Sequence, residues 1–501
     1  KLQMNRLNKR RWPGELVCRR RCVAAEALVR FGIAPSAVGL VAFASFFCSP
    51  LLAEVAEGRP NVLLIITDDQ NDYFAHSSGV NAKTPALDKL RKQAIAFPHA
   101  YCASPVCGPS RAALFSGLYP HHTGAYLNGA DPWRTSAQLM ACETLPELFR
   151  RSGYTTWGMG KLFHAKLTDG RGDRQWDNRS SANGGFGPFG DKDHQFAGKF
   201  FSVQEWDGPD SDFPDVKSAN AAAKFLRQYK SAEPFFMVYG LWRPHNPWTA
   251  PRRFFDLYDS NQIPFPPPGY RKEDLVDVPP GGRELSAIYA QRWNGFGDSN
   301  RDAWRRILHG YLACTSFADW NIGRVIEALD DSKHASNTIV IVTSDNGFHV
   351  GEKHHFGKST LWEKSANVPL WIRLPNKMHA GIECSAQVGL IDLYPTLKSK
   401  CELGSQAQKL DGTDLSPLLA NPAIQWTRPA ITTYGEGRFS LRSGRWRYIR
   451  YNDGKEELYD HRNDRHEFRN LATESGHDDI LESFRKSVPQ RWQSSLGGRN
   501  G

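Results

Sequence analysis

The sequence predicts an α/β protein with a large, mixed, mostly parallel β-sheet sandwiched between helices, followed by a smaller C-terminal antiparallel-sheet subdomain. Strand-like runs alternate with helical stretches through most of the chain, which is typical of parallel strands joined by helices. Near Trp426 the pattern changes to short alternating segments. The chain has 501 residues, of which 40% are hydrophobic and 12% aromatic, and this composition indicates a globular protein with a large core.

Three apolar runs have the composition of strands that are buried on both faces, as parallel sheets require. They are residues 61–67 (NVLLIIT), 234–239 (PFFMVY) and 338–343 (TIVIVT). Helices are predicted over 84–93, with Thr84 as N-cap and Pro85 as first helical residue, and over 145–152. Residues 168–190 are rich in Gly, Asp, Asn and Arg and are predicted to form a long surface loop. The Pro-rich segment 263–282 is predicted to be irregular.

The C-terminal segments predict a small antiparallel sheet. Residues 438–441, 446–450 and 457–460 read as its strands, and a closing helix is expected at about 479–495. We therefore expect three parts, which are a leader of residues 1–53, a main domain of residues 54–425, and a C-terminal subdomain of residues 426–501.

Residues 1–53 have the form of an export signal. Arg19, Arg20 and Arg21 precede an apolar run that ends in Leu51-Leu52-Ala53, where cleavage is expected. A transmembrane anchor is the alternative, although the prolines and small residues of the run weaken a spanning helix. No later segment is apolar enough to span a membrane. We therefore expect an exported protein, periplasmic or secreted, without stable membrane insertion once the signal is removed.

The charge of the chain bears on a nucleic-acid partner, and its cysteine content bears on disulfide bridges and zinc sites. The formal net charge is +10, but residues 1–53 hold nine Lys or Arg against two Asp or Glu, so the remainder is nearly neutral. We therefore expect no nucleic-acid partner. Six of the nine cysteines lie beyond the leader, which is too few for a disulfide scaffold in a chain of this size. A Cys384–Cys401 bridge remains open, and no Cys-x-x-Cys pair suggests zinc.

The three predicted strands are followed by polar residues suited to a metal site. Ligands of α/β sheets bind beyond the carboxyl ends of the strands. Adjacent carboxylates after a buried strand need a cation nearby, and oxygen ligands favour a hard ion such as calcium or magnesium. An isolated Asp-Asp pair also fits a solvated turn. The residues in question are Asp68 and Asp69, then Trp242-Arg-Pro-His245, and then Ser344-Asp345-Asn346-Gly347.

A second chemical centre is predicted at Cys107, in the segment 102–124 (CASPVCGPSRAALFSGLYPHHTG). Pro109 and the helix-forming residues after it place Cys107 just ahead of a helix N-terminus, where backbone N–H groups favour an anion. Gly108 keeps the approach free of side-chain bulk. From the residues alone, Cys107 is either a reactive thiolate or a buried inert thiol.

Cys107-x-Pro109-Ser110-Arg111, followed by Ala-Ala-Leu-Phe-Ser-Gly, resembles the signature of the sulfatase family, whose cysteine is oxidised to formylglycine. The other pieces of that family follow in its order, and the resemblance covers about residues 59–472. It implies an alkaline phosphatase-like fold. The similar segments are 61–69, 158–164 (GMGKLFH), Arg243-Pro-His245 and 344–358 (SDNGFHVGEKHHFGK).

Within that family the chain looks most like the iduronate-2-sulfatase group. GKLFH, RPHNP and the VPLWIRLP run at 368–375 support this likeness. Asn346 is a departure, because that group often has His there, whereas Asn is common in sulfatases generally. The departure leaves sulfatase chemistry intact but weakens any inference about the sugar.

The resemblance implies a mechanism and assigns the site residues. A formylglycine-generating enzyme would convert Cys107 to an aldehyde, and one hydroxyl of the aldehyde hydrate would attack sulfur. One Ca²⁺ would be held by Asp68, Asp69, Asp345, Asn346 and the side chain at 107. The other implied residues are Lys161, Lys358 and Arg111 as positive charge on the sulfate, His245 as general acid assisted by Lys358, and His164 as acceptor of the second hydroxyl proton.

The substrate expected from this likeness is a sulfated sugar or glycosaminoglycan-like polysaccharide, with uronate-2-sulfate units or algal polysaccharides as candidates. The single sequon at Asn178 favours a bacterial exported enzyme over a lysosomal one. Two alternatives remain, a phosphate or phosphonate monoester hydrolase of the same superfamily and a non-catalytic glycan-binding relative. Residues expected at the rim or sugar pocket are Trp133, Arg134, Phe348, His349, His354, His355 and the 168–190 loop.

Overall fold

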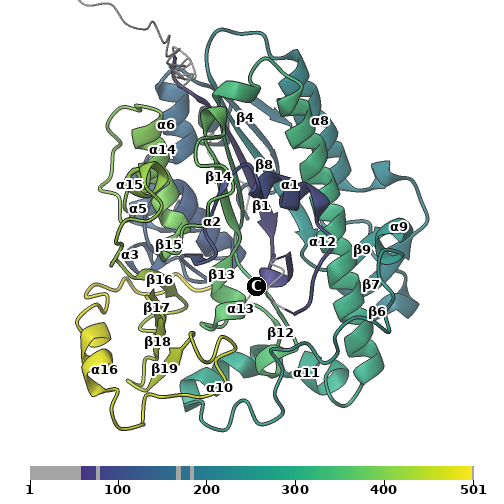
Figure 1. Ribbon diagram of the computed structural model, residues 1–501, viewed down its shortest axis with the longest axis vertical. Helices are drawn as coiled ribbons and strands as arrows, with labels where there is room; N and C mark the ends of the chain where they lie inside the picture. Colours follow the sequence, from purple (N-terminus) through teal and green to yellow (C-terminus); the bar gives the residue numbers. More distant parts are fainter. Residues whose placement is uncertain (1–57, 75–78, 165–166, 168–170, 181–184, 499–501) are drawn as a thin grey trace, which may run out of the picture. The chain divides into compact units, whose positions relative to one another are not determined.

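The computed structural model describes residues 58–74, 79–164, 167, 171–180 and 185–498 (Figure 1). The predicted export signal, residues 1–53, therefore lies outside the described residues. Within the described part of the chain, none of the helices is both long enough and apolar enough to cross a bilayer.

A seven-stranded sheet forms the centre of the described structure, with strand order β2-β14-β10-β1-β8-β4-β5. Strands β10, β1, β8, β4 and β5 run parallel to one another, whereas β14 runs antiparallel to both of its neighbours, β10 and β2. The predicted mixed, mostly parallel sheet is therefore confirmed. The bounds are β1 Asn61–Asp68, β2 Ile95–Ala96, β4 Thr155–Gly160, β5 Asn178–Ser180, β8 Phe235–Pro244, β10 Thr338–Ser344 and β14 Leu370–Arg373.

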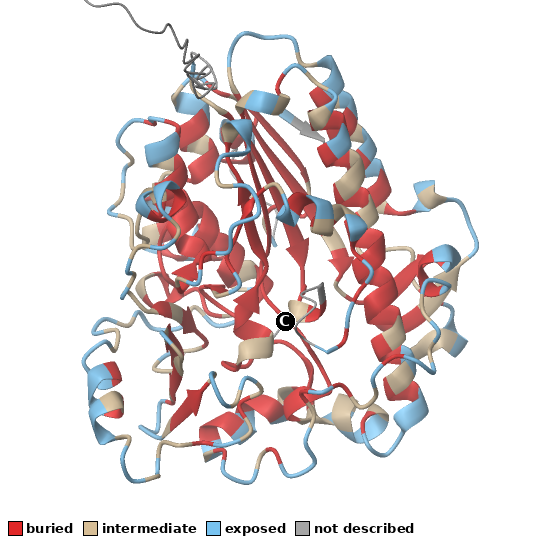
Figure 2. Cartoon of the chain, viewed as in Figure 1, coloured by how far each residue is buried: buried red, intermediate tan, exposed pale blue. Residues whose placement is uncertain are grey.

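Helices cover both faces of this sheet because its central strands are apolar on both sides. Val62, Leu64 and Ile66 of β1 pack in one hydrophobic cluster with α2 (Cys107–Ser116), α6 (Leu145–Arg151) and α14 (Leu393–Lys400). Leu63 and Ile65 pack in another, with α1 (Pro85–Arg91), α8 (Pro214–Gln228) and α12 (Arg301–Asp330). Figure 2 shows the resulting buried central sheet. The alternation of side chains along a strand thus divides one apolar run between two cores.

The start of α1 differs from the sequence prediction in its capping contact. Thr84 occupies the N-cap position, but its hydroxyl makes no capping hydrogen bond. The carboxylate of Asp319 on α12 accepts hydrogen bonds from the backbone N–H groups of Ala86 (3.1 Å) and Leu87 (2.7 Å) instead. A tertiary contact therefore supplies the acceptor that local sequence led us to expect from Thr84.

The expected surface loop at 168–190 is partly wrong. It contains the short helix α7 (Arg171–Gln175) and the edge strand β5, which pairs with β4. The ring of Trp176 is buried and stacks near that of Phe236, with a centroid distance of 6.4 Å. The sequence did not predict α7 and β5 because the segment is mostly polar and only a few of its residues face the core.

The C-terminal antiparallel sheet is confirmed and has four strands, β16 (Ala430–Thr433), β17 (Phe439–Ser443), β18 (Trp446–Arg450) and β19 (Glu456–Asp460). Helix α16 (Asp478–Arg485) packs against it through Leu481 and Phe484. The expectation that this helix continues to about 495 is wrong. Pro489 lacks the N–H that a continuing helix would need.

The remaining elements are short and connect these layers. These elements are β3 Ala100–Tyr101, α3 Pro120–Thr123, α4 Pro132–Thr135, α5 Ala137–Ala141, β6 Gln195–Ala197, β7 Phe201–Trp206, β9 Trp248–Pro251, α9 Arg252–Phe255, α10 Pro280–Ser286, α11 Ala290–Phe296, β11 His349–Val350, β12 Phe356–Gly357, α13 Glu363–Ala366, β13 Asn367–Val368, β15 Val388–Gly389 and α15 Ser416–Ala420.

The six cysteines of the described chain are all free and buried, so the Cys384–Cys401 bridge is not formed.

Arg447 on β18 links the C-terminal sheet to α13, and it yields a stability prediction. Its buried guanidinium pairs with Glu467 at 2.6 Å and with Glu363. Arg447→Met would leave the buried Glu467 and the partly buried Glu363 without this cation, and we expect a loss of about 3–5 kcal/mol in the free energy of unfolding. Urea denaturation followed by tryptophan fluorescence measures it. Arg450→Met, on the same strand but only partly buried, is the matched control, and equal losses in both variants would contradict the prediction.

Candidate functional site

The ends of four parallel strands bring the predicted site residues together. Because β10, β1, β8 and β4 are neighbours and parallel, the residues that follow them meet at one edge of the sheet. Asp69 adopts a left-handed backbone conformation with φ of 61°, and its carbonyl accepts a hydrogen bond of 2.6 Å from the Tyr311 hydroxyl. The turn after β1 is thus held from α12.

Three buried carboxylates at this edge face three buried cations. Lys161 pairs with Asp68, Lys358 pairs with Asp69 at 2.6 Å, and Arg111 pairs with Asp345 at 2.7 Å. Burial tends to raise the pKa of Asp68, but the positive charges of Lys161, His245 and Lys358 together outweigh burial, and the pKa lies below its usual value. Each of the three carboxylates therefore has a cation of its own as partner.

Arg111 uses its donors inside the protein. Besides Asp345, its guanidinium contacts the backbone carbonyls of Lys161, Leu162 and Thr67. A planar guanidinium with this many fixed partners positions the ends of β4 and β1 relative to Asp345. The positive charge of Arg111 lies directly against Asp345.

Buried oxygen atoms without partners mark the place where a cation fits. Asp68 Oδ1, Asp69 Oδ2 and Asn346 Oδ1 are buried and accept no hydrogen bond from the described residues. The Asn346 amide donates to Asp69 Oδ1 at 2.7 Å. Ligand atoms of Asp68, Cys107 and Asp345 lie within 4.8 Å of one another, as do those of Asp68, Asp69 and His245. Unsatisfied buried oxygens of this kind fit a hard cation such as Ca²⁺.

Cys107 is the first residue of α2 and lies beside these charges. Its Sγ is 3.3 Å from His164 Nδ1 and 3.6 Å from Lys358 Nζ. Burial would raise the pKa of this thiol, but Lys161, Lys358 and His164 together lower it to about 6. Burial instead raises the pKa of the nearby Cys102 thiol. The structure therefore gives Cys107 the surroundings of a reactive thiolate rather than an inert thiol.

Asn128 is a site residue that sequence reasoning missed. Its Nδ2 donates to Cys107 Sγ at 3.4 Å and its Oδ1 accepts from the Gly108 N–H at 2.9 Å. A Cβ added at Gly108 would meet Asn128 Oδ1 at 2.4 Å, which explains why this position has no side chain. A single asparagine in a loop after α3 carries no sequence signal that distinguishes it from a turn residue.

The two predicted catalytic histidines flank the site. His245 Nε2 is 3.5 Å from Asp69 Oδ2, and burial lowers the His245 pKa to about 4 although Asp69 and Asp68 oppose this. An anion placed beside it would raise this pKa, which is the direction that a proton donor requires. Buried Asp215 holds the preceding strand end, accepting from the backbone N–H groups of Trp242 (2.8 Å) and Arg243 (3.1 Å). His164 is exposed and contacts Cys107.

Some residues expected at the rim lie in the interior. His349 and His355 are fully buried, and Phe348 packs against Trp248 and Tyr311. His355 Nε2 is 2.8 Å from the carbonyl oxygen of Lys358 and thereby supports the segment that carries this lysine. Trp133 is buried, and its ring centroid lies 5.4 Å from that of Phe163. Phe348, His355 and Trp133 therefore lie in the interior rather than at the rim, whereas His349 contributes to the lining of a separate cavity.

Comparison with known proteins agrees with the geometry of the site. Residues 60–399 match the sulfatase family model, and residues 351–494 match the model of the N-sulphoglucosamine sulphohydrolase C-terminal region. A sulfatase of Formosa agariphila is 35% identical over 453 residues, which cover 86% of this chain and 87% of that protein. Iduronate 2-sulfatase of Mus musculus is 28% identical, covering 67% of this chain and 68% of that protein.

Solved structures share the fold. A phosphonate monoester hydrolase of Agrobacterium radiobacter superposes with a TM-score of 0.69 at 19% identity, covering 86% of this chain and 94% of the other. A 2-O GAG sulfatase superposes with a TM-score of 0.65 at 22% identity, covering 86% and 91%. The fold is therefore alkaline phosphatase-like. Since the family model covers residues 60–399 and a relative is 35% identical along 86% of the chain, this protein belongs to the sulfatase family of sulfuric ester hydrolases.

Proposed function

We propose that this enzyme hydrolyses sulfate esters of a sulfated sugar or glycosaminoglycan-like polysaccharide, with Cys107 converted to formylglycine and one Ca²⁺ at the strand ends. The observation that carries the proposal is the position of Cys107. It begins a helix, contacts Lys358 and His164, and lies within ligand distance of the buried carboxylates Asp68 and Asp345. A side chain at this position can contact both a bound cation and an anionic ester.

The residues that would hold Ca²⁺ are those with buried oxygens at the strand ends. When bound, the ion supplies Lewis-acid polarisation of the attacking oxygen and of the sulfate. As a formylglycine hydrate, residue 107 supplies a nucleophilic hydroxyl and a second hydroxyl whose deprotonation releases sulfate. The proposed ligands are Asp68, Asp69, Asp345, Asn346 and the side chain at position 107.

The other residues of the site move protons and hold charge. We assign His245 Nε2 as the donor of a proton to the leaving oxygen, because it points toward Asp69 from the end of β8. His164 Nδ1, 3.3 Å from the side chain at 107, is the acceptor of a proton there. Lys161 and Lys358 stabilise the negative charge of the sulfate group, and Lys358 also assists His245.

The sugar assignment rests on relatives. The names of iduronate 2-sulfatase and of the 2-O GAG sulfatase specify sulfated uronic acid or glycosaminoglycan substrates for those proteins. We propose a substrate of this class here. Residues 1–53 are proposed to direct export to the periplasm or outside the cell of a bacterium, ahead of a catalytic domain at 54–425 and a subdomain at 426–501. Maturation requires a formylglycine-generating enzyme.

A phosphate or phosphonate monoester hydrolase is the second candidate, because one structural neighbour is a phosphonate monoester hydrolase. We expect kcat/KM for 4-nitrophenyl sulfate to exceed that for 4-nitrophenyl phosphate and for a phenyl phosphonate monoester by at least about tenfold, equivalent to roughly 1.4 kcal/mol in transition-state binding. Side-by-side initial rates with the same calcium-loaded preparation measure this. A preference for either phosphorus ester would reverse the assignment.

Cys107→Ser is expected to abolish multiple turnover while leaving the fold intact. A serine has one hydroxyl and lacks the second one needed to release sulfate, so the enzyme stops as a sulfate ester. Steady-state hydrolysis of 4-nitrophenyl sulfate and mass spectrometry of the peptide spanning position 107 provide the measurement. Cys384→Ser, which alters a free buried thiol outside the site, should retain turnover. Sustained turnover by Cys107→Ser would exclude the proposed nucleophile.

Asp345→Ala is expected to lose bound calcium and activity together. The change removes a buried carboxylate that faces Asp68 and Cys107, and it also leaves Arg111 without its partner. Metal analysis of the purified protein and the rate of aryl sulfate hydrolysis measure the two losses, and EDTA treatment of the parent protein should reproduce both. Asp207→Asn, at a surface carboxylate, is the control. A normal calcium content in Asp345→Ala would remove this residue from the ligand set.

A further inference from the structure

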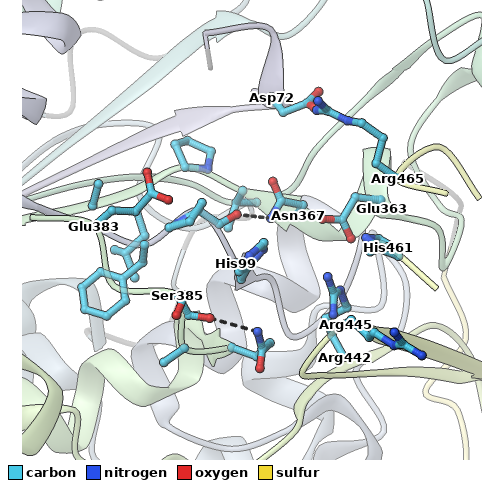
Figure 3. Close-up of a pocket in the computed structure, with 18 of the residues that line it drawn as sticks. Asp72, His99, Glu363, Asn367, Glu383, Ser385, Arg442, Arg445, His461 and Arg465 are labelled. Atoms are coloured by element: carbon cyan, nitrogen blue, oxygen red, sulfur yellow. Dashed lines mark hydrogen bonds and ion pairs between the residues drawn. The ribbon is translucent and has the colours of Figure 1, made fainter. Parts of the chain in front are cut away.

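A cavity of about 1160 Å³ is lined by residues other than the catalytic ones (Figure 3). None of its described lining residues is among those assigned to catalysis or metal binding. Its walls come from α1, from β13 and β14, and from the turn between β17 and β18. The cavity therefore lies where the central sheet's antiparallel edge and the C-terminal sheet contribute facing residues. A volume of this size is sufficient for a bound organic ligand.

Arg442 of β17 brings an incompletely satisfied charge to this cavity. Its side chain is only 2% exposed, and its Nη1 donates to the carbonyls of Gly444 and Trp446. Its Nε has no hydrogen-bond partner, and none of the described carboxylates forms an ion pair with it. A buried guanidinium left in this state favours an anionic ligand that would complete its contacts.

The acidic residues on the same wall form their ion pairs with another arginine rather than with Arg442. Arg447 pairs with Glu363 and Glu467, and Glu467 also contacts His461 Nε2 at 3.0 Å. The grouping of Glu363, His461 and Glu467 therefore fits its own arginine and needs no metal ion. Arg442 lies beside this network without an ion pair to any of the described carboxylates, and its charge helps to lower the pKa of Glu363, after the larger effect of Arg447.

Further cationic groups lie near Arg442. In the view of Figure 3, Arg445 is drawn on the same side of the cavity as Arg442, and Glu383 on the opposite side. Arg445 is partly exposed and contacts Asp460 at 3.3 Å. Glu383 pairs with Arg91 at 3.0 Å, away from Arg442. Arg442 and Arg445 therefore bring two guanidinium groups to one side of the cavity.

The indole ring of Trp426 and the amide of Gln387 also line this cavity. Trp426 is partly exposed to the cavity, and its Nε1 donates to the carbonyl of Gln387 at 3.1 Å. Gln387 in turn accepts a hydrogen bond from the Gly444 N–H at 2.9 Å. These contacts fix the indole ring and the β17–β18 turn before any ligand arrives. A fixed aromatic face next to arginine donors matches the alternation of apolar ring faces and anionic groups in a charged sugar.

We propose that this cavity is a second saccharide-binding site, which holds a sulfated or carboxylated sugar unit of the polyanionic chain whose other unit is cleaved at Cys107. Arg442 and Arg445 bind the anionic group, and Trp426 packs against the sugar ring. This proposal rests on the proposed glycan substrate. It predicts that long anionic oligosaccharides bind more tightly than short ones through contacts outside the catalytic residues.

The test is calorimetric titration of the non-cleaving Cys107→Ser protein with a heparin octasaccharide, a heparin disaccharide and sodium sulfate at equal ionic strength. Adding Arg442→Gln should weaken octasaccharide binding by about tenfold, because it removes a charge-assisted hydrogen bond to the anionic group, and it should leave disaccharide binding unchanged. Arg445→Gln and Trp426→Ala, at partly exposed positions, should weaken it in the same direction. If Arg442→Gln fails to fold, as judged by thermal melting, these two variants decide the question.

Arg253→Gln is the matched control, since it removes one positive charge from a half-exposed arginine that does not line the cavity. Equal octasaccharide affinity in parent and cavity variants, or no octasaccharide binding by the parent, overturns the proposal. Sodium sulfate binding that is as tight and as sensitive to Arg442→Gln assigns the cavity to free sulfate and also overturns it. Hydrolysis of 4-nitrophenyl sulfate by the Cys107-containing enzyme tests the proposed function separately, and the cavity variants should leave that rate unchanged.

Discussion

Three carboxylates that are buried at the edge of one sheet repel one another, and the surrounding structure is arranged to offset this repulsion. Asp68, Asp69 and Asp345 come from two adjacent strands whose pairing sets their separation. Lys161, Lys358 and Arg111 reach them from β4, from the segment after β12 and from α2. Five separate stretches of chain are thereby tied to one point, and several carboxylate and amide oxygens remain free there for a metal ion.

The same arrangement determines the chemistry of Cys107. The lysines that balance the carboxylates also lie close enough to the thiol to lower its pKa against the effect of burial. Asn128 and His164 complete its surroundings through direct contacts with Sγ. One set of charges therefore serves the carboxylates and the residue at 107, so a change in either affects both.

The C-terminal sheet contributes to the molecule through charge as well as packing. Arg447 connects it to α13, which lies directly between the Lys358 segment and β13 in the chain. Arg442, three residues after the start of the same sheet's second strand, forms no ion pair with any carboxylate of the described residues and lines a cavity. Arg447, which forms ion pairs inside the protein, and Arg442, which we propose binds a ligand, thus lie on neighbouring strands. The difference in their partners accounts for the difference in their roles.

The sequence alone determined the fold class, the three buried strands, the acidic residues at their ends and the position of Cys107 at a helix start, because these follow from local apolar runs and a contiguous motif. The family resemblance then predicted catalytic roles for Lys161, His164, His245 and Lys358. Only the tertiary structure decided that Asp319 caps α1, that residues 171–180 join the sheet, and that Asn128 contacts Cys107. Those contacts join residues that are far apart in the sequence or that lie in polar segments. Hydrophobic periodicity and motif spacing describe only local patterns and therefore do not predict such contacts.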